Sequence, residues 1–419
     1  MVSAPFLSSE QAFAIRETFG TPVFVYDQNA LESAARAAQA FPNAWGLTVR
    51  FAMKALPTAA ILQVFNRSGL HLDASSGFEA ERAILAGIPP AHIQITAQEL
   101  PVNLKELVEQ GCLFNACSLR QLDVYGGMFP GAEVSVRINP GLGSGHSNRT
   151  NVGGPSSSFG IWHAYLDDAL QLAQKHNLRI TGMHTHIGSG ADPEIWLHCA
   201  TLALASVARM PEVTRLSLGG GFKPARMEYE TGADLQVIGA RLRPAFEAFA
   251  VEHGRKLHLE LEPGALLTAN AGALMCSVSD VVDTGDEGFR FIKTDTGMTD
   301  ILRPPLYGAQ HPITLFVAAP RGEETVPYLV AGHCCESGDL LSPEPGNPEG
   351  LQPRELPRAE VGDILVIGGA GAYCAAMATK NYNSFPESPE VLLDRNGVPH
   401  LIRKRQSMAQ LVQNELSLE

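Results

Sequence analysis

A regular alternation of two residue patterns between positions 47 and 264 constrains the fold of this chain more than any other feature. Short apolar stretches of strand character are separated by amphipathic stretches, in which apolar residues recur every three or four positions, as in helices with one buried face. The strand candidates are residues 47–54, 70–76, 92–97, 113–118, 134–140, 180–188, 215–221 and 257–264. The helix candidates are residues 59–69, 78–87, 103–111, 119–129, 165–177, 194–210 and 235–254. Eight strands with intervening helices over roughly 230 residues predict an α/β fold with a TIM-type (β/α)8 barrel.

Chemically active side chains and glycines stand at the ends of most of these predicted strands. In TIM barrels the active site lies at the carboxyl ends of the strands, in the loops that lead into the helices. Polar groups gathered at that end are difficult to explain as packing, so we expect the functional site there. The residues concerned are Lys54, Asp73, Arg137, Asn139, His184, His186, Ser189, Gly219–Gly221, Glu260, Glu262 and Gly264.

From about residue 275 the sequence changes to strands joined by short turns, with no long helix until the last residues. The Asn-Gly pair at 396–397 is typical of a tight hairpin. This pattern predicts a second, all-β domain of sandwich or barrel-like form. The N-terminal stretch TPVFVYD, residues 21–27, is expected to join it. We therefore predict a barrel domain at 28–275 and a discontinuous β domain made of residues 1–27 and 276–419. Loop 141–160 has no secondary-structure pattern and is of the length that is usually functional.

Composition excludes several classes of protein. The formal net charge is −13 and no basic tract stands out, so nucleic acid is not an expected partner. No apolar run reaches the ~18 residues of a membrane span, and the first residues lack the pattern of a secretory signal. The seven cysteines are scattered, without a CxxC pair, which favours a reducing, cytoplasmic compartment over a disulfide scaffold.

Lys54, at the end of the first predicted strand, has two readings. An isolated lysine there extends its ammonium into water, and this is the more common case. The alternative is a lysine that forms a Schiff base with pyridoxal phosphate, in the company of a phosphate cradle and a carboxylate. The glycine run 219–221 could be a simple turn, but it lies after the seventh strand, where barrels often bind phosphate. Ser189 could add a hydroxyl to it.

Glu262 and His186 also have an ordinary and a functional reading. Glu262 could be a solvated strand end, or a carboxylate bonded to a pyridine nitrogen, which makes the ring an electron sink. A lone His186 is more often a satisfied core histidine, but it could stack on a cofactor ring. His184 and His186 share one strand face, yet no Cys or Asp stands at ligand spacing, so we predict no metal site.

The β domain contributes weaker candidates. In CCESGD, residues 334–339, Cys334 reads as a small buried residue. Cys335 could act as a general acid, and Glu336 could receive an ammonium. Tyr373 could reach a phosphate through its hydroxyl, although core packing explains it about as well.

At these residues the sequence resembles the fold-type III pyridoxal-phosphate-dependent decarboxylases, which have an alanine-racemase-like barrel and a C-terminal β domain. The resemblance runs from TPVFVYD to LIRKRQSMAQLV, nearly the whole chain. Its motifs are FAMKA, HTHIGSG, GGG, EPG, DTGMTDILRPPLYGAQH, CESGD and GAY with NYNS. The loop GHSNRTNVGG…FGIW is also similar to one branch of that family. The resemblance implies decarboxylation of an amino acid, and within the family it is strongest to the branch that converts meso-2,6-diaminopimelate to L-lysine.

The resemblance also implies a role for each matching residue. Lys54 would carry the pyridoxal phosphate, His186 would stack on its ring, and Glu262 would meet the pyridine nitrogen. Cys335 would protonate the α-carbon after carbon dioxide leaves. The remaining cofactor residues would be Asp73, Ser189, Gly220, Gly221, Gly264 and Tyr373, and the substrate residues would be Arg303, Tyr307, Glu336 and Tyr373. The family is a head-to-tail homodimer, in which Cys335 and Glu336 would reach the neighbouring subunit's site.

Two positions depart from the family pattern and leave alternatives open. The family usually has Arg after EPG, where this chain has Ala265, and Lys where it has Ser158. Loss of an arginine removes a charge-assisted bond to a carboxylate, typically ~1.5 to 3 kcal/mol. The first alternative is a decarboxylase on the same scaffold that acts on D-lysine, ornithine or carboxynorspermidine. A non-catalytic binding homologue is less favoured because Lys54, Glu262 and Cys335 are retained. A racemase would need a second base on the β domain.

Overall fold

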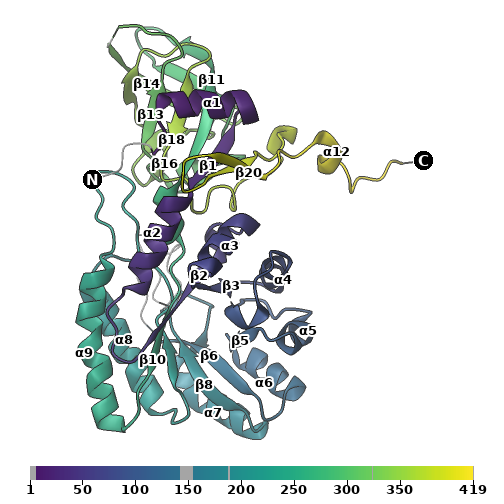
Figure 1. Ribbon diagram of the computed structural model, residues 1–419, viewed down its shortest axis with the longest axis vertical. Coiled ribbons are helices and arrows are strands. Elements are labelled where there is room, and N and C mark those ends of the chain that lie inside the picture. The colour runs from purple at the N-terminus through teal and green to yellow at the C-terminus, as the bar shows by residue number, and fades with distance from the viewer. Residues whose placement is uncertain (1–5, 142–153, 187–188, 323, 419) are drawn as a thin grey trace. The chain divides into compact units, whose positions relative to one another are not determined.

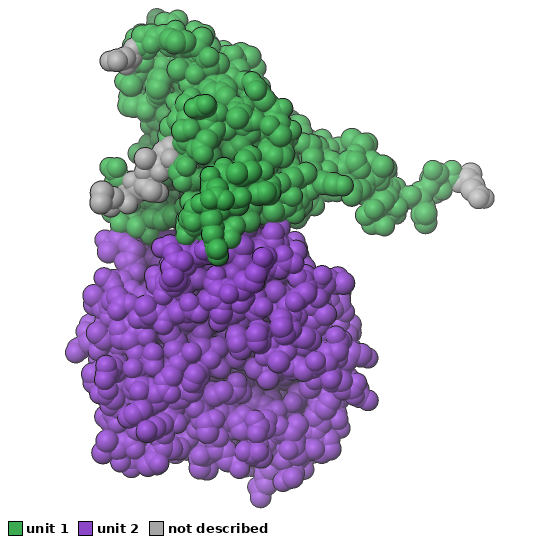
Figure 2. Space-filling view, in the orientation of Figure 1, with its two compact units in different colours: residues 1–31, 225–230, 268–419 green, residues 32–224, 231–267 purple. Residues whose placement is uncertain are grey.

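The computed structural model describes residues 6–141, 154–186, 189–322 and 324–418. The chain forms two compact units, which Figure 2 shows in different colours. Unit 1 comprises residues 1–31, 225–230 and 268–419, and unit 2 comprises residues 32–224 and 231–267. The domain boundaries expected from the sequence, at 27/28 and 275/276, stay a prediction about which parts of the chain fold independently.

Unit 2 contains a closed ring of eight parallel strands, which confirms the TIM-type barrel (Figure 1). The strands are β2 (Leu47–Ala52), β3 (His71–Ala74), β4 (Ile93–Ile95), β5 (Leu113–Ala116), β6 (Glu133–Asn139), β8 (Arg179–His184), β9 (Arg215–Ser217) and β10 (His258–Leu261). Each strand pairs with the next in this order, and β10 pairs with β2 to close the ring. The short strand β7 (Ile161–Trp162) pairs with the end of β6.

All seven stretches expected to be helical between these strands are helices. They are α3 (Ala59–Arg67), α4 (Gly77–Leu85), α5 (Leu104–Glu109), α6 (Leu119–Met128), α7 (Leu166–Lys175), α8 (Pro193–Ala208) and α9 (Leu235–His253). Several begin at a polar cap that satisfies free backbone N–H groups. Ser76 accepts from the N–H of Glu79 at the start of α4, and Ser118 accepts from Gln121 at the start of α6. Because Ser76 and Ser118 follow β3 and β5 closely, the loops before α4 and α6 are short, whereas the loop between β9 and α9 is long.

One strand ends earlier than the sequence predicted, at a place that matters for the site. Residues 47–54 were expected to form one strand, but β2 ends at Ala52, and Lys54 lies in the 3-10 turn η1 (Met53–Ala55). The pairing of β2 with β3 ends at Ala52 and Asp73, so the backbone beyond Ala52 is free to turn. Lys54 is therefore placed by a turn after the strand, and its side chain is exposed.

Unit 1 is built on a mixed sheet. Its strands include β1 (Val23–Asp27), β11 (Gly272–Asp283), β12 (Arg290–Thr294), β13 (Ile313–Phe316), β14 (Thr325–Ala331), β17 (Arg354–Pro357), β18 (Ile364–Ile367), β19 (Glu390–Leu393) and β20 (Pro399–Arg403). The N-terminal strand β1 pairs antiparallel with β11 and parallel with β19, so it belongs to this sheet. Strands β19 and β20 form the hairpin that the Asn-Gly turn indicates, with Gly397 at φ +80°.

Some elements were not anticipated from the sequence. Helix α1 (Ser9–Phe19) begins at a capping box between Ser8 and Gln11, and its buried Ala12 and Ile15 belong to the same apolar core as Val23 and Val25. Only two of its side chains are buried, which explains the weak amphipathic pattern. The other unanticipated helices and strands are α2 (Gln28–Gln39), α10 (Ala265–Thr268), α11 (Arg303–Tyr307), β7, β15 (Pro343–Glu344), β16 (Asn347–Leu351) and β17. Near the C-terminus α12 (Met408–Leu411) is the expected last helix. None of the helices in the described ranges has the length and apolarity that a membrane crossing requires.

Candidate active site

The carboxyl of Glu262, one residue beyond β10, is the centre of a polar network inside the barrel. Ser217 donates its hydroxyl to Glu262 Oε1 at 2.8 Å, and Gln94 donates its amide to the same oxygen at 3.3 Å. His184 Nε2 lies 2.7 Å from Glu262 Oε2. These side chains come from β9, β4 and β8, and β4 and β8 are not neighbours of β10 in the ring. The bonds therefore cross the barrel interior, and all four side chains are buried.

The surroundings of Glu262 oppose its ionisation. Burial raises the pKa of Glu262 to about 7, although the hydrogen bond from Ser217 lowers it. Burial, and then the charge of Arg137, lowers the pKa of His184 well below its ordinary value. His184 is therefore neutral and donates Nε2–H to Glu262, while its Nδ1 has no partner among the described residues. A cation placed at this carboxyl would ionise it.

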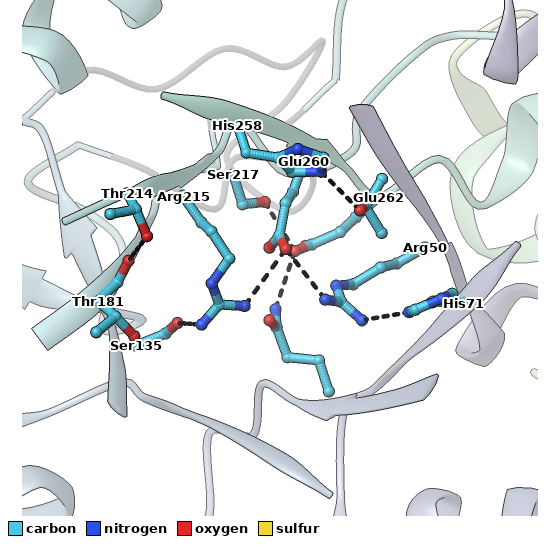
Figure 3. A network of polar contacts seen from close by, with 12 residues as sticks. Arg50, His71, Ser135, Thr181, Thr214, Arg215, Ser217, His258, Glu260 and Glu262 are labelled. Carbon is cyan, nitrogen blue, oxygen red and sulfur yellow. Dashed lines mark hydrogen bonds and ion pairs between the residues drawn. The ribbon is translucent and has the colours of Figure 1, made fainter. Parts of the chain in front are cut away.

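Glu260, on the same face of β10, has the opposite environment (Figure 3). Arg50 Nη2 lies 3.1 Å and Arg215 Nη1 lies 3.4 Å from Glu260 Oε1. Burial opposes ionisation, but the two guanidinium groups lower the pKa of Glu260. Arg215 also donates to Ser135, and Arg50 Nη1 lies 3.4 Å from His71 Nδ1. The two carboxyls on this strand face therefore differ. The pKa of Glu260 is lowered by its arginine partners, whereas the pKa of Glu262 is raised by burial.

Asp73, at the end of β3, interacts electrostatically with both Glu262 and Lys54. Burial, reinforced by Glu262, raises the pKa of Asp73 well above its ordinary value, and Lys54 opposes this. Asp73 Oδ1 is buried and has no hydrogen-bond partner within the described part of the chain. The exposed ammonium of Lys54 is therefore the cation felt by this buried carboxyl, which keeps both readings of Lys54 open.

The glycine run after β9 leaves no room for side chains. A Cβ at Gly220 would lie 2.2 Å from the carbonyl oxygen of Glu262, so only glycine fits there. Gly219 has φ +71° and Gly221 has φ +95°. The N–H of Gly220 donates to His186 Nδ1 at 3.0 Å, which fixes the imidazole beside the run. Burial, and then Arg137, lowers the pKa of His186 well below its ordinary value, so the ring is neutral.

Two further residues predicted for the cofactor lie in the same unit. Gly264 would place a Cβ 3.3 Å from the Cβ atoms of Ala52 and Ala55, so it packs closely beside η1. Ser189 follows residues 187–188, which are outside the described ranges, and the next residue, Gly190, forms a β-bridge with Phe222. The structure thus brings Lys54, Asp73, His186, Ser189, Gly220, Gly221, Glu262 and Gly264 together in unit 2.

The other predicted residues belong to unit 1. Cys335 and Glu336 are exposed in the loop after β14. Asn383 Nδ2 donates to Cys335 Sγ at 3.4 Å, and the N–H of Cys335 donates to Asn383 Oδ1 at 3.3 Å. The hydroxyl of Tyr382 lies 4.0 Å from the same sulfur. Cys335 is therefore an accessible thiol that is oriented by the NYNS segment.

Arg303 and Tyr307 are the first and last residues of α11, and Tyr373 has a left-handed backbone with φ +56°. Such a backbone is uncommon for a residue with a side chain and often marks a functional position. Arg303 Nε is buried and has no hydrogen-bond partner among the described residues. These groups and Cys335 all lie in unit 1, whereas Lys54 and Glu262 lie in unit 2.

The two positions that depart from the family pattern have simple surroundings. Ser158 Oγ accepts a hydrogen bond of 2.7 Å from Gln98, and Ala265 is the first residue of α10. Residues 142–153 of the long loop lie outside the described ranges. Within those ranges no three His, Cys, Asp or Glu side chains gather as a metal site would require.

Sequence reasoning did not single out several residues that build the site. Ser217 and Gln94 hold Glu262, Asn383 holds Cys335, and Arg226 is a buried arginine of unit 1. The sequence did contain a signal for Ser217 and Gln94. Each lies on the inward face of its strand, where a buried polar side chain needs a hydrogen-bond partner. Asn383 lies in the NYNS motif, but Arg226 lies in a segment without any pattern.

Comparisons with known proteins agree with this geometry. Residues 29–269 match the family described as "Pyridoxal-dependent decarboxylase, pyridoxal binding domain". The chain is similar to the diaminopimelate decarboxylase of Escherichia coli K12, with 37% identity over 98% of this chain and 97% of the relative. It is 36% identical to that of Streptomyces coelicolor, over 95% of this chain and 90% of the relative.

Solved structures give the same result. A crystal structure of a diaminopimelate decarboxylase superposes with a TM-score of 0.90 at 36% identity, covering 97% of this chain and 96% of that one. The Helicobacter pylori diaminopimelate decarboxylase in complex with L-lysine has a TM-score of 0.84 at 26% identity, with 96% and 98% covered. In both cases the similarity extends over the barrel and the β domain.

Proposed function

This chain belongs to the diaminopimelate decarboxylase family of pyridoxal-dependent decarboxylases, and we propose that it converts meso-2,6-diaminopimelate to L-lysine and carbon dioxide, the last step of lysine biosynthesis. The observation that carries the proposal is the 37% identity to a named diaminopimelate decarboxylase over 98% of the chain. The buried carboxyl of Glu262, with its pKa raised to about 7, supports the same chemistry from the geometry.

The side chains of the barrel fit pyridoxal phosphate as the cofactor. Glu262 is a buried carboxyl that a protonated ring nitrogen would ionise, and Asp73 Oδ1 is a buried acceptor without a partner among the described residues. The glycine run suits a phosphate because a backbone without side chains lets a ligand approach closely, although the amides of Gly219 and Gly220 already donate to Ser217 and His186. When bound, pyridoxal phosphate supplies an electron sink for the electron pair that the departing carboxylate leaves behind. The residues that would hold it are Lys54, Asp73, His186, Ser189, Gly220, Gly221, Glu262, Gly264 and Tyr373.

Each residue of the chain would then have one task. Lys54 would attach the cofactor through its amine, and His186 would hold the flat face of the ring. Glu262, supported by Ser217, Gln94 and His184, would keep a proton on the ring nitrogen. The neutral state of His184 matters here because a charged imidazole would compete for the negative charge of Glu262.

Proton return to the α-carbon falls to Cys335 in this proposal. Its thiol is exposed and is held by Asn383, so it is accessible to a substrate. The distal end of the substrate would be bound by Arg303, Tyr307, Glu336 and Tyr373. We propose a homodimer with shared active sites, in which the partner subunit's Cys335 completes each site. We also propose a cytoplasmic location, which the seven free cysteines support.

Carbon dioxide release from defined substrates tests the proposal. The purified protein, loaded with pyridoxal phosphate, is incubated separately with meso-diaminopimelate, D-lysine, ornithine and carboxynorspermidine. We expect release mainly from the first. Release from another of these substrates instead would favour the alternative that Ala265 keeps open, a decarboxylase of a different amino acid. A protein that binds the cofactor but releases carbon dioxide from none of them would contradict an enzymatic role.

A further inference from the structure

Arg226 is a buried guanidinium of unit 1 that its surroundings satisfy only in part. Its side chain is 7% exposed, and its Nε donates to the carbonyl of Gly369 at 2.9 Å. Gly369 has φ +63°, and a Cβ there would lie 3.0 Å from Arg226 Cγ and Cδ, so the loop packs directly on the arginine stem. Arg226 Nη2 is buried and has no hydrogen-bond partner among the described residues. The head group is thus held firmly, with one donor nitrogen unused.

Burial and the charge of Arg303 disfavour the charged form of Arg226 more than Cys374, Glu230 and Tyr373 favour it. Burial first, and then the guanidinium of Arg303, lowers the pKa of Arg226. His311 lies in the field of both arginines, and burial with these charges lowers its pKa well below the ordinary value. Within the described ranges neither arginine forms an ion pair with a carboxylate. The nearby Glu230 accepts instead from the backbone N–H groups of Arg226 and Met227.

A purely structural role explains this arrangement poorly. One hydrogen bond to Gly369 could be made by an uncharged side chain, without the desolvation that a buried charge requires. Arg303 adds a second buried donor, Nε, that also has no partner among the described residues. Two guanidinium groups that repel each other and still have free donors are arranged as a site for an oxyanion. A carboxylate between them would use the free donors and neutralise the repulsion.

We propose that Arg226 and Arg303 together bind the carboxylate that the substrate keeps, which is the one present in L-lysine. The inference rests on the proposed function and makes it more specific. The chain has Ala265 where the family usually has a substrate-binding arginine, so Arg303 alone would otherwise carry this recognition. Arg226 supplies a second cationic group, and the planar fork of a guanidinium suits a carboxylate.

The test compares two ligands that differ in this carboxylate. Binding of L-lysine and of cadaverine, which has no carboxylate, is measured by titration calorimetry on the pyridoxal-phosphate-loaded protein. Arg226→Gln is expected to weaken L-lysine binding by about 10- to 100-fold, the loss of a charge-assisted bond. The affinity of Arg226→Gln for cadaverine should stay within about twofold of that of the unsubstituted protein. The affinity of Arg226→Lys for L-lysine should lie between those of the unsubstituted protein and Arg226→Gln.

Matched controls separate this role from a loss of folding. Arg321 is also a largely buried arginine of unit 1, but Asp363 and Glu360 pair with it. Arg321→Gln is expected to lower the unfolding temperature without changing the ratio of the two affinities. Because Arg226→Lys keeps the charge, it provides a second variant if Arg226→Gln does not fold.

The outcomes distinguish the inference from the proposed function. Unchanged L-lysine affinity in Arg226→Gln would overturn the inference, even if the unsubstituted protein releases carbon dioxide from meso-diaminopimelate. Weaker binding of pyridoxal phosphate with unchanged L-lysine affinity would also overturn it, because the oxyanion would then be the cofactor's phosphate. If the unsubstituted protein does not act on meso-diaminopimelate, the proposed function fails, and the inference fails with it.

Discussion

The two units differ in how their buried charged side chains are paired. Inside the barrel, Glu260 is paired with Arg50 and Arg215, and Glu262 receives hydrogen bonds from side chains of β9, β4 and β8. In unit 1, Arg226 and Arg303 have buried nitrogens without partners in the described chain. In the barrel Arg50 Nε also lacks a hydrogen-bond partner within the described chain, but Arg50 is ion-paired with Glu260, whereas neither Arg226 nor Arg303 is ion-paired with a described carboxylate. The difference indicates which charges serve the fold and which are kept for a ligand.

The largest effect is expected at Lys54, on the barrel side of this comparison. Lys54→Ala removes the amine that would attach the cofactor, so turnover should fall on the order of 10⁴-fold or more. Carbon dioxide release from meso-diaminopimelate measures it. Since Lys54 is exposed and outside the strand pairing, the unfolding temperature of the cofactor-free protein should not change. Full turnover in this variant would return Lys54 to the ordinary reading of a lysine that extends into water.

The corresponding residue of unit 1 is Cys335. Cys335→Ala removes the proposed proton donor, and turnover should fall by about 10²- to 10⁴-fold. If active sites are shared in a homodimer, mixing Lys54→Ala and Cys335→Ala subunits should restore up to about a quarter of the activity, because half of the random dimers carry one complete site. No recovery after the subunits have demonstrably exchanged would contradict the shared site.

Much of this comparison could be predicted from the sequence, because barrel chemistry follows a local pattern. Polar residues at strand ends predicted a site that includes Lys54, Asp73, His186 and Glu262, all of which lie in unit 2, and the alternation of strands and helices predicted the barrel. Periodicity did not reveal that Lys54 lies in a turn beyond Ala52. The strand ends there because its pairing with β3 ends at Ala52 and Asp73, and such pairing joins residues that are distant in the sequence.

Arg226 shows what local patterns cannot provide. It lies in an irregular segment, and its environment is made by Arg303, His311 and Gly369, all distant in the sequence. Desolvation and the repulsion between Arg226 and Arg303 are properties of the folded chain, so no spacing rule predicts them. The same limit applies to Asn383, whose bond to Cys335 joins two loops.

Stability should separate the paired from the unpaired arginines. Arg50→Met leaves Glu260 with only Arg215, and breaking such a buried pair costs about 3 to 5 kcal/mol. Arg226→Met loses its bond to Gly369 but also removes a desolvated charge, so unfolding free energy should change by less than about 1 kcal/mol. Thermal unfolding of the ligand-free proteins measures both. Equal destabilisation would show that Arg226 is as structural as Arg50.

The pH dependence of stability tests the titratable carboxyl of the barrel. The folded pKa of Glu262, about 7, is above its ordinary value of 4.5, so the folded protein holds this proton more tightly than the unfolded chain. The stability it contributes is fully present below pH 4.5 and is lost as the pH rises through about 7. By linkage this amounts to about 3 kcal/mol over that window.

The matched control for this pH effect is Glu262→Gln, which cannot titrate. The cofactor-free unsubstituted protein should lose stability relative to Glu262→Gln between pH 4.5 and 7, and the difference should then stay constant. Asp73 is present in both proteins, but Glu262 raises the pKa of Asp73, so the difference reports the titration of the two interacting carboxyls together. A difference that does not vary with pH would mean that Glu262 is already ionised in the folded protein at pH 4.5.

The smallest effect is expected at Asn383, which orients the Cys335 thiol but does not itself transfer a proton in the proposed reaction. Asn383→Ala removes two hydrogen bonds of 3.3 and 3.4 Å to an exposed loop, each worth about 1 kcal/mol at most in this setting. Turnover should fall by about 5- to 10-fold while the Michaelis constant stays unchanged, because positioning of the proton donor affects the chemical step and not ground-state binding. Asn383→Asp keeps the acceptor for the N–H of Cys335 and should lose less. A change in the Michaelis constant alone would instead place Asn383 in substrate binding, together with the arginines of the same unit.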